Sequence, residues 1–240
     1  MKKRKIALIT ALATAAAAAA GGAAWYLNQP RKDRPDPRKR YLACIGDSIT
    51  FGAGVVLARH QQAWPYLLER LLGVDCQVLN YGISGATAVD TGDKPYRSTD
   101  FFDTALSVNA DTYLFMLGTN DSKPYNWDAA EYEKAAGEML DDLRSTGARV
   151  IVLLPPKAFP KKNGKIAFDI QDDVIREQVI PILRKEAEKR NLSTIDLYHF
   201  TEGHPEYFDD GVHPNAAGNR NIAAFVFSRL RDLWDDSAIF

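Results

Sequence analysis

The sequence has 240 residues, of which 46% are hydrophobic and 25% are charged, and its formal net charge is −1. This length and composition are typical of one globular domain with a sizeable core. The small net charge, and the lack of a stretch in which basic and aromatic residues alternate, exclude nucleic acid as an expected partner.

The first 40 residues differ in composition from the rest of the chain. MKKRK precedes 22 uncharged residues, 6–27, and this pattern predicts an export signal or an N-terminal membrane anchor over residues 1–27. The uncharged run continues past the small residues at 20–24 into Trp25, Tyr26 and Leu27, which favours the anchor slightly. Residues 28–40, NQPRKDRPDPRKR, predict an extended, basic, proline-rich linker that could touch anionic lipid. We therefore expect an exported protein, either anchored in the membrane or secreted after cleavage.

From residue 41 to the end of the chain, strand-like and helix-like segments alternate and predict one domain, 41–240. Apolar runs predict strands at 41–45, 77–81, 111–117, 149–154 and 192–197, and amphipathic patterns predict helices at 64–72, 128–145, 169–190 and 214–234. We expect Pro181 to kink the third of these helices and Pro214 to lie in the first turn of the last. Strands that alternate with helices predict a parallel sheet covered on both faces, an α/β fold of three layers.

Polar and glycine-rich stretches follow the predicted strands, where ligands of such sheets bind. GDSITFGAG follows the first strand, NYGISGAT the second and GTNDS the third, while DGVHPN precedes the last helix. Ester hydrolysis by a serine needs a base, a group that orients the base, and donors for the oxyanion. We interpret Ser48 as the nucleophile, His213 as the base and Asp210 as its partner. The oxyanion donors are the Ser48 N–H, the Gly85 N–H and the Asn120 amide.

Other roles for these residues were weighed against catalysis. Taken alone, the DGVHPN stretch would fit a helix cap and a solvated turn. Ser84 is a competing nucleophile and His204 a competing base, but neither has a companion group nearby in the sequence. Asp47 is expected to brace the turn before the serine.

Metal and disulfide chemistry have little support in the sequence. It holds two cysteines, Cys44 and Cys76, without a Cys-x-x-Cys pair, and it lacks the acidic spacing of a hard-cation site, so no metal is expected. We favour two buried thiols over a disulfide, which strand neighbours could still allow.

The four blocks together, in this order, resemble the SGNH, or GDSL-type, esterase superfamily, and the match extends from residue 41 to 233. The resemblance implies a flavodoxin-like sheet in the order 2-1-3-4-5, no metal and no cofactor. It also implies the same roles for the five site residues named above. The chain has no G-x-S-x-G turn around its GDS serine, unlike the α/β-hydrolases.

Three stretches, GDKPYRST, GTNDSKPYNW and EGHPEYFDDGVHPN, resemble the sialate O-acetylesterase-like and other carbohydrate acetylesterases of that superfamily. Aromatic rings in these loops could stack on sugars and basic groups could meet an acidic sugar, although the rings could equally pack the loops. The candidate substrate-binding residues are Tyr96, Arg97, Lys123 and Trp127, with Lys94 and Tyr125 as further members of the set.

We therefore expect a serine esterase that removes acetyl groups from a carbohydrate. The alternatives are a lysophospholipase or thioesterase of the same superfamily, acyl transfer in place of hydrolysis, and a non-catalytic glycan-binding module on the same scaffold. The expected partner is an acylated small molecule or glycan, and the oligomeric state stays open.

Overall fold

The computed structural model describes residue 36 and residues 38–235. The predicted signal or anchor, 1–27, and most of the predicted linker lie outside the described residues. No helix in the part of the chain that the structure describes is long and apolar enough to cross a membrane.

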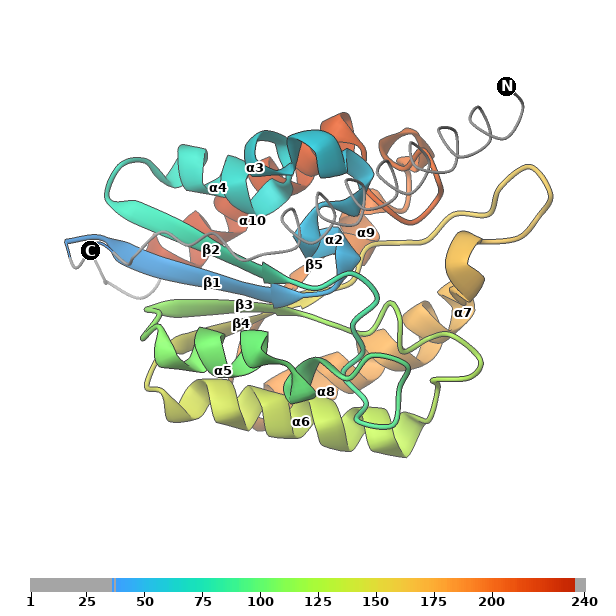
Figure 1. Cartoon of the computed structure of the whole chain (residues 1–240), viewed down its shortest axis with the longest axis horizontal. Helices are drawn as coiled ribbons and strands as arrows, with labels where there is room; N and C mark the ends of the chain where they lie inside the picture. Colours follow the sequence, from blue (N-terminus) through green and yellow to red (C-terminus); the bar gives the residue numbers. More distant parts are fainter. Residues whose placement is uncertain (1–35, 37, 236–240) are drawn as a thin grey trace, which may run out of the picture. The chain divides into compact units, whose positions relative to one another are not determined.

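A five-stranded parallel sheet lies at the centre of the described domain (Figure 1). Its strand order is β2-β1-β3-β4-β5, as the resemblance implied, and the predicted fold class is confirmed. The strands are β1 Arg40–Gly46, β2 Cys76–Gly82, β3 Thr112–Met116, β4 Arg149–Leu154 and β5 Ser193–Asp196.

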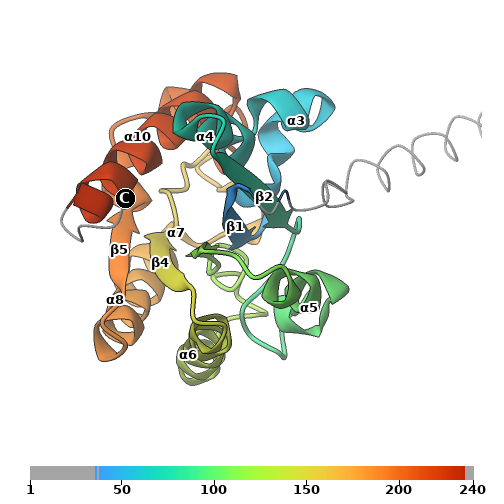
Figure 2. The same cartoon turned by 90° about the vertical axis from the view of Figure 1, so that its left-hand side faces the viewer.

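Helices cover both faces of the sheet and complete the three layers (Figure 2). α5, α6 and α8 pack over one face, and α4 and α10 pack over the other. The helices are α2 Ser48–Phe51, α3 Arg59–Gln62, α4 Trp64–Leu72, α5 Asp100–Ser107, α6 Ala129–Ser145, α7 Asp172–Val174, α8 Ile180–Lys189, α9 Leu197–Thr201 and α10 Ala216–Asp235. Single turns of 3-10 helix span Tyr96–Ser98, Ala167–Asp169 and Pro205–Tyr207, and a longer one spans Ala53–Ala58.

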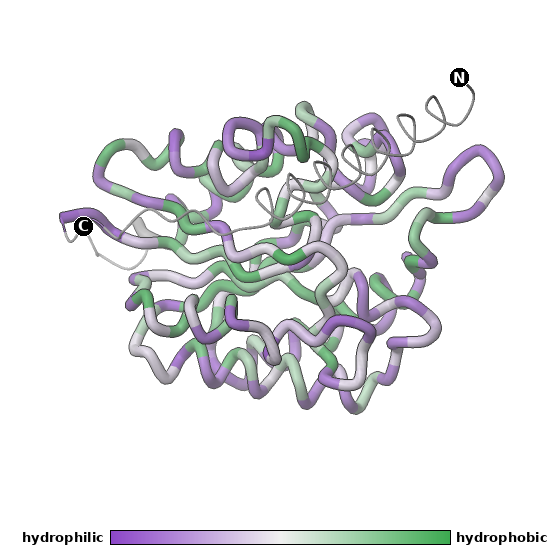
Figure 3. Tube along the Cα trace, viewed as in Figure 1, coloured by the Kyte–Doolittle hydropathy of each residue, from purple (hydrophilic) through white to green (hydrophobic). Residues whose placement is uncertain are grey.

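The strands are apolar on both faces because both faces are covered. In β3, Tyr113 and Phe115 point into the core under α5, α6 and α8, whereas Leu114 and Met116 point into the core under α4 and α10. The central strands are accordingly mostly hydrophobic in Figure 3, while the outer helices alternate.

Pro214 lies before the last helix and not, as expected, in its first turn, and the helical segment that contains Pro181 is irregular. The segment predicted as one kinked helix, 169–190, contains a π-helix, Ile175–Val179, directly before α8, and Pro181 lies in the first turn of α8. A wide turn accommodates the missing proline N–H. α10 begins two residues after Pro214, because the Asn215 side chain accepts hydrogen bonds from the N–H groups of Ala217 and Gly218 and so caps the helix.

The two cysteines are free thiols and form no disulfide with each other, as expected, but only Cys44 is buried, whereas Cys76 is half-buried. Cys44 is buried and lies opposite Asn80 in the β1–β2 register, whereas Cys76 lies opposite Arg40, four positions away.

Candidate active site

The turn after β1 holds Ser48 at the start of α2. Asp47 caps this helix through its Oδ1 atom, which accepts a hydrogen bond from the Ile49 N–H at 2.8 Å, so Asp47 does brace the turn. Gly46 is needed because a Cβ there would lie 2.2 Å from the Thr50 hydroxyl oxygen. The tight turn leaves the Ser48 side chain at the carboxyl edge of the sheet, only 6% exposed.

The loop between α9 and α10 brings His213 to this serine. His213 Nε2 lies 2.9 Å from Ser48 Oγ, and His213 Nδ1 lies 2.7 Å from Asp210 Oδ2. Asp210 Oδ1 also accepts the backbone N–H groups of Val212 and His213, which fixes the carboxylate within its own loop. The structure thus joins three residues that lie up to 165 positions apart into one hydrogen-bonded series.

The Asp210 carboxylate is held in its charged form. Partial burial raises the pKa of Asp210, but the hydrogen bonds from the His213 ring and from the backbone N–H groups outweigh burial and lower the pKa to about 2. A charged carboxylate on Nδ1 leaves Nε2 free to accept the serine proton and stabilises the imidazolium that results.

Two contacts keep the serine turn and the histidine loop in register. Gly54 passes so close to the loop that a Cβ would lie 2.3 Å from the Pro214 carbonyl oxygen. The buried Asn219 side chain donates to that same carbonyl at 2.6 Å and accepts the Trp64 N–H at 2.9 Å. The distance between Ser48 and His213 is therefore set by rigid backbone.

The predicted oxyanion donors lie on neighbouring loops. Asn120 Nδ2 donates one hydrogen bond to the Ala86 carbonyl at 3.1 Å, next to Gly85, and within the described part of the chain no acceptor takes its second hydrogen. Gly85 has a φ of +84°, which strongly favours glycine. Among the described residues, no hydrogen-bond acceptor takes the N–H of either Gly85 or Ser48. The structure therefore joins Ser48, His213 and Asp210 by hydrogen bonds, and it places Gly85 and Asn120 close to each other on the loops after β2 and β3, the two strands that flank β1.

Two fully buried carboxyl groups, Asp47 and Asp121, are the chain neighbours of Ser48 and Asn120. Burial raises the pKa of Asp47 to about 6, although the Ile49 N–H and the charge of His213 oppose the shift. Burial also raises the pKa of Asp121 to about 7, although its Oδ1 accepts the N–H groups of Ala88 and Val89. These two groups fix loops and do not touch the Ser48–His213 pair by hydrogen bonds.

The prediction that Tyr96 stacks on a sugar is wrong. Its ring is fully buried in the core, and its hydroxyl donates to the Tyr81 carbonyl at 2.6 Å. Arg97 is bound by two carboxylates of α6, Glu138 and Asp142, so its charge serves to hold the loop on that helix.

The other predicted substrate residues are partly committed to the fold. Lys123 is buried and pairs with Asp93 at 3.2 Å, and Trp127 packs on the core while its ring N–H donates to Gln178. Lys94 is exposed beside Gly85, with its ammonium group on the Ser84 carbonyl. Protein partners therefore already occupy the polar groups of three predicted substrate residues, Arg97, Lys123 and Trp127.

The contacts that the structure shows for the competing nucleophile, Ser84, which is next to Gly85, and for the competing base, His204, do not involve the Ser48–His213–Asp210 series. Ser84 uses its carbonyl to hold Lys94, and His204 binds Glu206 at 2.9 Å and stacks on Tyr207. Within residues 38–235 no group of three or more His, Cys, Asp or Glu side chains is arranged to hold a metal ion.

Sequence patterns missed one residue of this edge, Phe168, in the loop after β4. Its ring lies 5.0 Å from the His213 ring, edge to face, and 56% of the residue is exposed. An apolar residue among lysines was the only sign of it in the sequence.

A cavity of about 770 Å³ lies at the opposite edge of the sheet, where β4 and β5 begin. Arg144, Arg149 and Arg190 are among its lining residues, and it includes none of the five site residues. Ligands of open parallel sheets bind at the carboxyl ends, so this cavity is not the active-site candidate.

Comparisons with known proteins agree with this geometry. Residues 44–220 match the GDSL-like Lipase/Acylhydrolase family. The chain is 31% identical over 224 residues to an acetylxylan esterase of Xylanibacter ruminicola, an alignment that covers 83% of this chain and 45% of that protein. The chain thus spans about half the length of this relative.

Solved structures share the fold. Est24, a carbohydrate acetylesterase from Sinorhizobium meliloti, superposes with a TM-score of 0.65 at 20% identity, over 81% of this chain and all of that one. The M. smegmatis aryl esterase superposes with a TM-score of 0.62 at 20% identity, over 81% of this chain and 99% of that one. The chain belongs to the GDSL-like lipase/acylhydrolase family, and the predicted family is confirmed.

Proposed function

We propose that this protein is a serine esterase that removes acetyl groups from a carbohydrate through a Ser48–His213–Asp210 triad. The observation that carries the proposal is the continuous hydrogen-bonded series of these side chains. The loops after the neighbouring strands β2 and β3 hold Gly85 and Asn120, the further oxyanion donors that we propose beside the Ser48 N–H. A non-catalytic binding module would have no need of this arrangement.

The reaction begins when Ser48 Oγ attacks the ester carbonyl carbon and His213 Nε2 takes the serine proton. The oxyanion that forms accepts hydrogen bonds from the Ser48 N–H, the Gly85 N–H and the Asn120 amide. His213 then gives its proton to the leaving alkoxide, which departs as an alcohol and leaves an acyl-enzyme. Water, deprotonated by the same histidine, attacks the carbonyl carbon of the acyl-enzyme. The bond to Ser48 Oγ then breaks, His213 returns its proton to that oxygen and the acid is released, while Asp210 stays ionised throughout.

The substrate class is supported by similarity rather than by the triad, which fixes only the reaction. The relative from Xylanibacter ruminicola is an acetylxylan esterase, and one structure of the same fold is a carbohydrate acetylesterase. We propose an acetylated glycan on these grounds, with water as the acceptor.

We also propose that the enzyme is exported, with residues 1–27 as its signal or anchor. The basic start and the 22 uncharged residues that follow support this proposal. Cell fractionation with an antibody to the catalytic domain tests it, since recovery of the protein only in the cytosol would contradict export.

The first test compares p-nitrophenyl acetate, octanoate and palmitate as substrates of the full-length chain and of Ser48→Ala. We expect a preference for the acetate that disappears in the variant. A preference for long chains would favour the lysophospholipase or thioesterase alternative. Absence of Ser48-dependent hydrolysis, together with tight binding of an acetylated glycan, would favour the binding module.

A further inference from the structure

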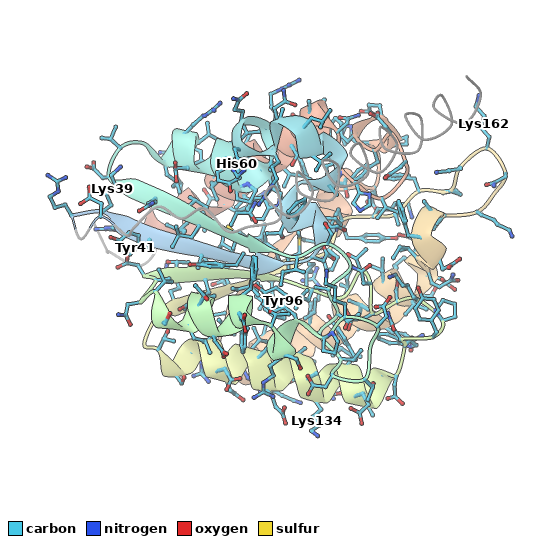
Figure 4. All side chains as sticks on the ribbon, viewed as in Figure 1. Lys39, Tyr41, His60, Tyr96, Lys134 and Lys162 are labelled. Atoms are coloured by element: carbon cyan, nitrogen blue, oxygen red, sulfur yellow. The ribbon has the colours of Figure 1, made fainter. Side chains whose placement is uncertain are left out.

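The loop after β4 lies at the same edge of the sheet as the candidate active site. It leaves β4 at residue 155, reaches α7 at residue 172, and projects from the carboxyl edge of the sheet, where Lys162 marks its outer part (Figure 4). None of the four sequence blocks of the family includes it.

Both ends of this loop are tied to the candidate catalytic blocks. The Phe159 N–H donates to the carbonyl of Gly211 at 2.8 Å, and Gly211 lies two residues before His213. At the other end, the Gln171 N–H donates to the Ser122 hydroxyl at 3.2 Å, two residues after Asn120. The loop therefore spans from the base to the oxyanion side of the site.

Between these ties the backbone holds Phe168 in an unfavourable conformation. Phe168 has φ +61° and ψ +24°, and Asp169 has φ +58°, two successive left-handed residues that are not glycine. Such a conformation is disfavoured for a bulky side chain and persists only where the surroundings impose it. Here the buried Ile170 anchors the chain immediately afterwards. The result is an aromatic ring that touches the His213 ring yet remains 56% exposed.

The position of this ring determines which part of an ester it can meet. His213 Nε2 faces Ser48 Oγ and must deliver its proton to the leaving oxygen, so the alcohol portion of the substrate leaves from beside the histidine. An apolar ring 5.0 Å from that histidine adjoins the alcohol portion. A pyranose has a face of C–H bonds that packs on an aromatic ring.

We propose that Phe168 is a specificity-determining residue, the platform on which the sugar ring of the alcohol portion stacks during hydrolysis. This inference rests on the proposed function, because it assigns the binding of a carbohydrate ester to that same site. It concerns recognition of the sugar and leaves the chemical steps unchanged.

The test measures acetate release from an acetylated methyl xyloside and from ethyl acetate by the full-length chain. Phe168→Asn removes the ring, and asparagine tolerates a positive φ, so the loop backbone is kept. We expect kcat/KM for the xyloside to fall roughly tenfold more than that for ethyl acetate, mainly through KM, since an aromatic stack contributes about that factor. Phe168→Tyr keeps an aromatic ring, so its ratio of kcat/KM for the xyloside to kcat/KM for ethyl acetate should stay within about twofold of the wild-type ratio.

Val74→Asn is the control. Val74 is 82% exposed and lies in the turn between α4 and β2, at the edge of the sheet opposite the candidate site. We expect this variant to leave the ratio of the two kcat/KM values unchanged.

Three outcomes would overturn the proposal. Equal losses on both substrates, with a displaced acid limb of the pH profile on ethyl acetate, would mean that Phe168 only positions His213. Unchanged xyloside kinetics in Phe168→Asn would mean that the ring contacts no sugar. A wild-type enzyme that cleaves ethyl acetate but no acetylated sugar would overturn the proposed substrate class as well, which separates the two failures.

Discussion

The carboxylates at the active-site edge of the sheet occupy two contrasting environments. Asp210 is one-third exposed and its pKa is lowered to about 2, because hydrogen bonds from His213 and the backbone outweigh its partial burial. Asp47 and Asp121 are fully buried, and burial raises their pKa values to about 6 and about 7. The same chemical group thus serves as a permanent charge at Asp210 and as a buried, protonatable structural element at Asp47 and Asp121. The difference lies in which cause wins, charge-assisted hydrogen bonding or desolvation.

Among changes to these carboxylates, the largest effect is expected from Asp210→Asn, which removes the charge beside His213. The amide keeps the size of the side chain but favours the wrong tautomer of His213, so kcat should fall by about 10⁴. The measurement is kcat on p-nitrophenyl acetate, with thermal unfolding as a check on folding. Asp209→Asn is the control, since Asp209 is exposed and binds Asn215 rather than the histidine. A loss below tenfold in Asp210→Asn would remove Asp210 from the triad.

Asn120→Ala tests whether the donors beside the triad act only in the transition state. We expect kcat to fall by about 10²–10³ with KM little changed, because the amide binds the oxyanion more strongly than the ester carbonyl. The variant also leaves the buried Ala86 carbonyl without its side-chain donor, so stability is measured in parallel. Undiminished kcat in a folded variant would refute the oxyanion assignment.

Gly54→Ala tests how rigidly the serine turn is fixed to the histidine loop. The added Cβ meets the Pro214 and His213 carbonyl oxygens at 2.3 and 3.1 Å, and rigid backbone must shift to make room. We expect a loss of about 1–3 kcal/mol in the free energy of unfolding, together with reduced kcat. Gly203→Ala is the control, because nothing lies within 4 Å of a Cβ there and its φ is not positive. Equal stability of the two variants would show that the close approach is unimportant.

The parts of the site that could be predicted are those with local sequence signals. Apolar runs define the strands, and the blocks around Ser48, Asn120 and His213 follow strand ends or precede a helix whose positions the periodicity gives. Tyr96 was misassigned because a polar neighbourhood in the sequence does not reveal that its ring is enclosed by tertiary contacts. Phe168 was missed because its place beside His213 depends on a backbone conformation that a phenylalanine rarely adopts.

The short helices α5 and α9 were not predicted from the sequence, again because the local signal is weak. α5 has eight residues and α9 only five, too few for a periodic pattern to stand out from a loop. The strand order came from family resemblance, since alternation of strands and helices alone does not say which strand lies beside which.

Asp121→Asn is expected to have the smallest effect on kcat, and it tests the buried carboxyl groups directly. Because the folded pKa of Asp121 exceeds its ordinary value of 3.8, the native state binds more protons than the unfolded state between about pH 4 and pH 7. Stability from this group is therefore present below pH 4 and is lost as pH rises through about 7, with a slope of at most about 1.4 kcal/mol per pH unit. Asparagine cannot titrate, yet its oxygen can still accept the Ala88 and Val89 N–H groups, so the variant should lose less stability over that interval.

Asp210 acts in the opposite direction and at a lower pH, since its contribution disappears only as pH falls from 3.8 through about 2. Chemical denaturation at pH 4.5, 6 and 8 measures the slopes, with the exposed Asp232→Asn as control. Parallel plots of the free energy of unfolding against pH for wild type and Asp121→Asn would mean that Asp121 is charged at neutral pH. The contrast between the exposed and the buried carboxylates would then rest on Asp47 alone.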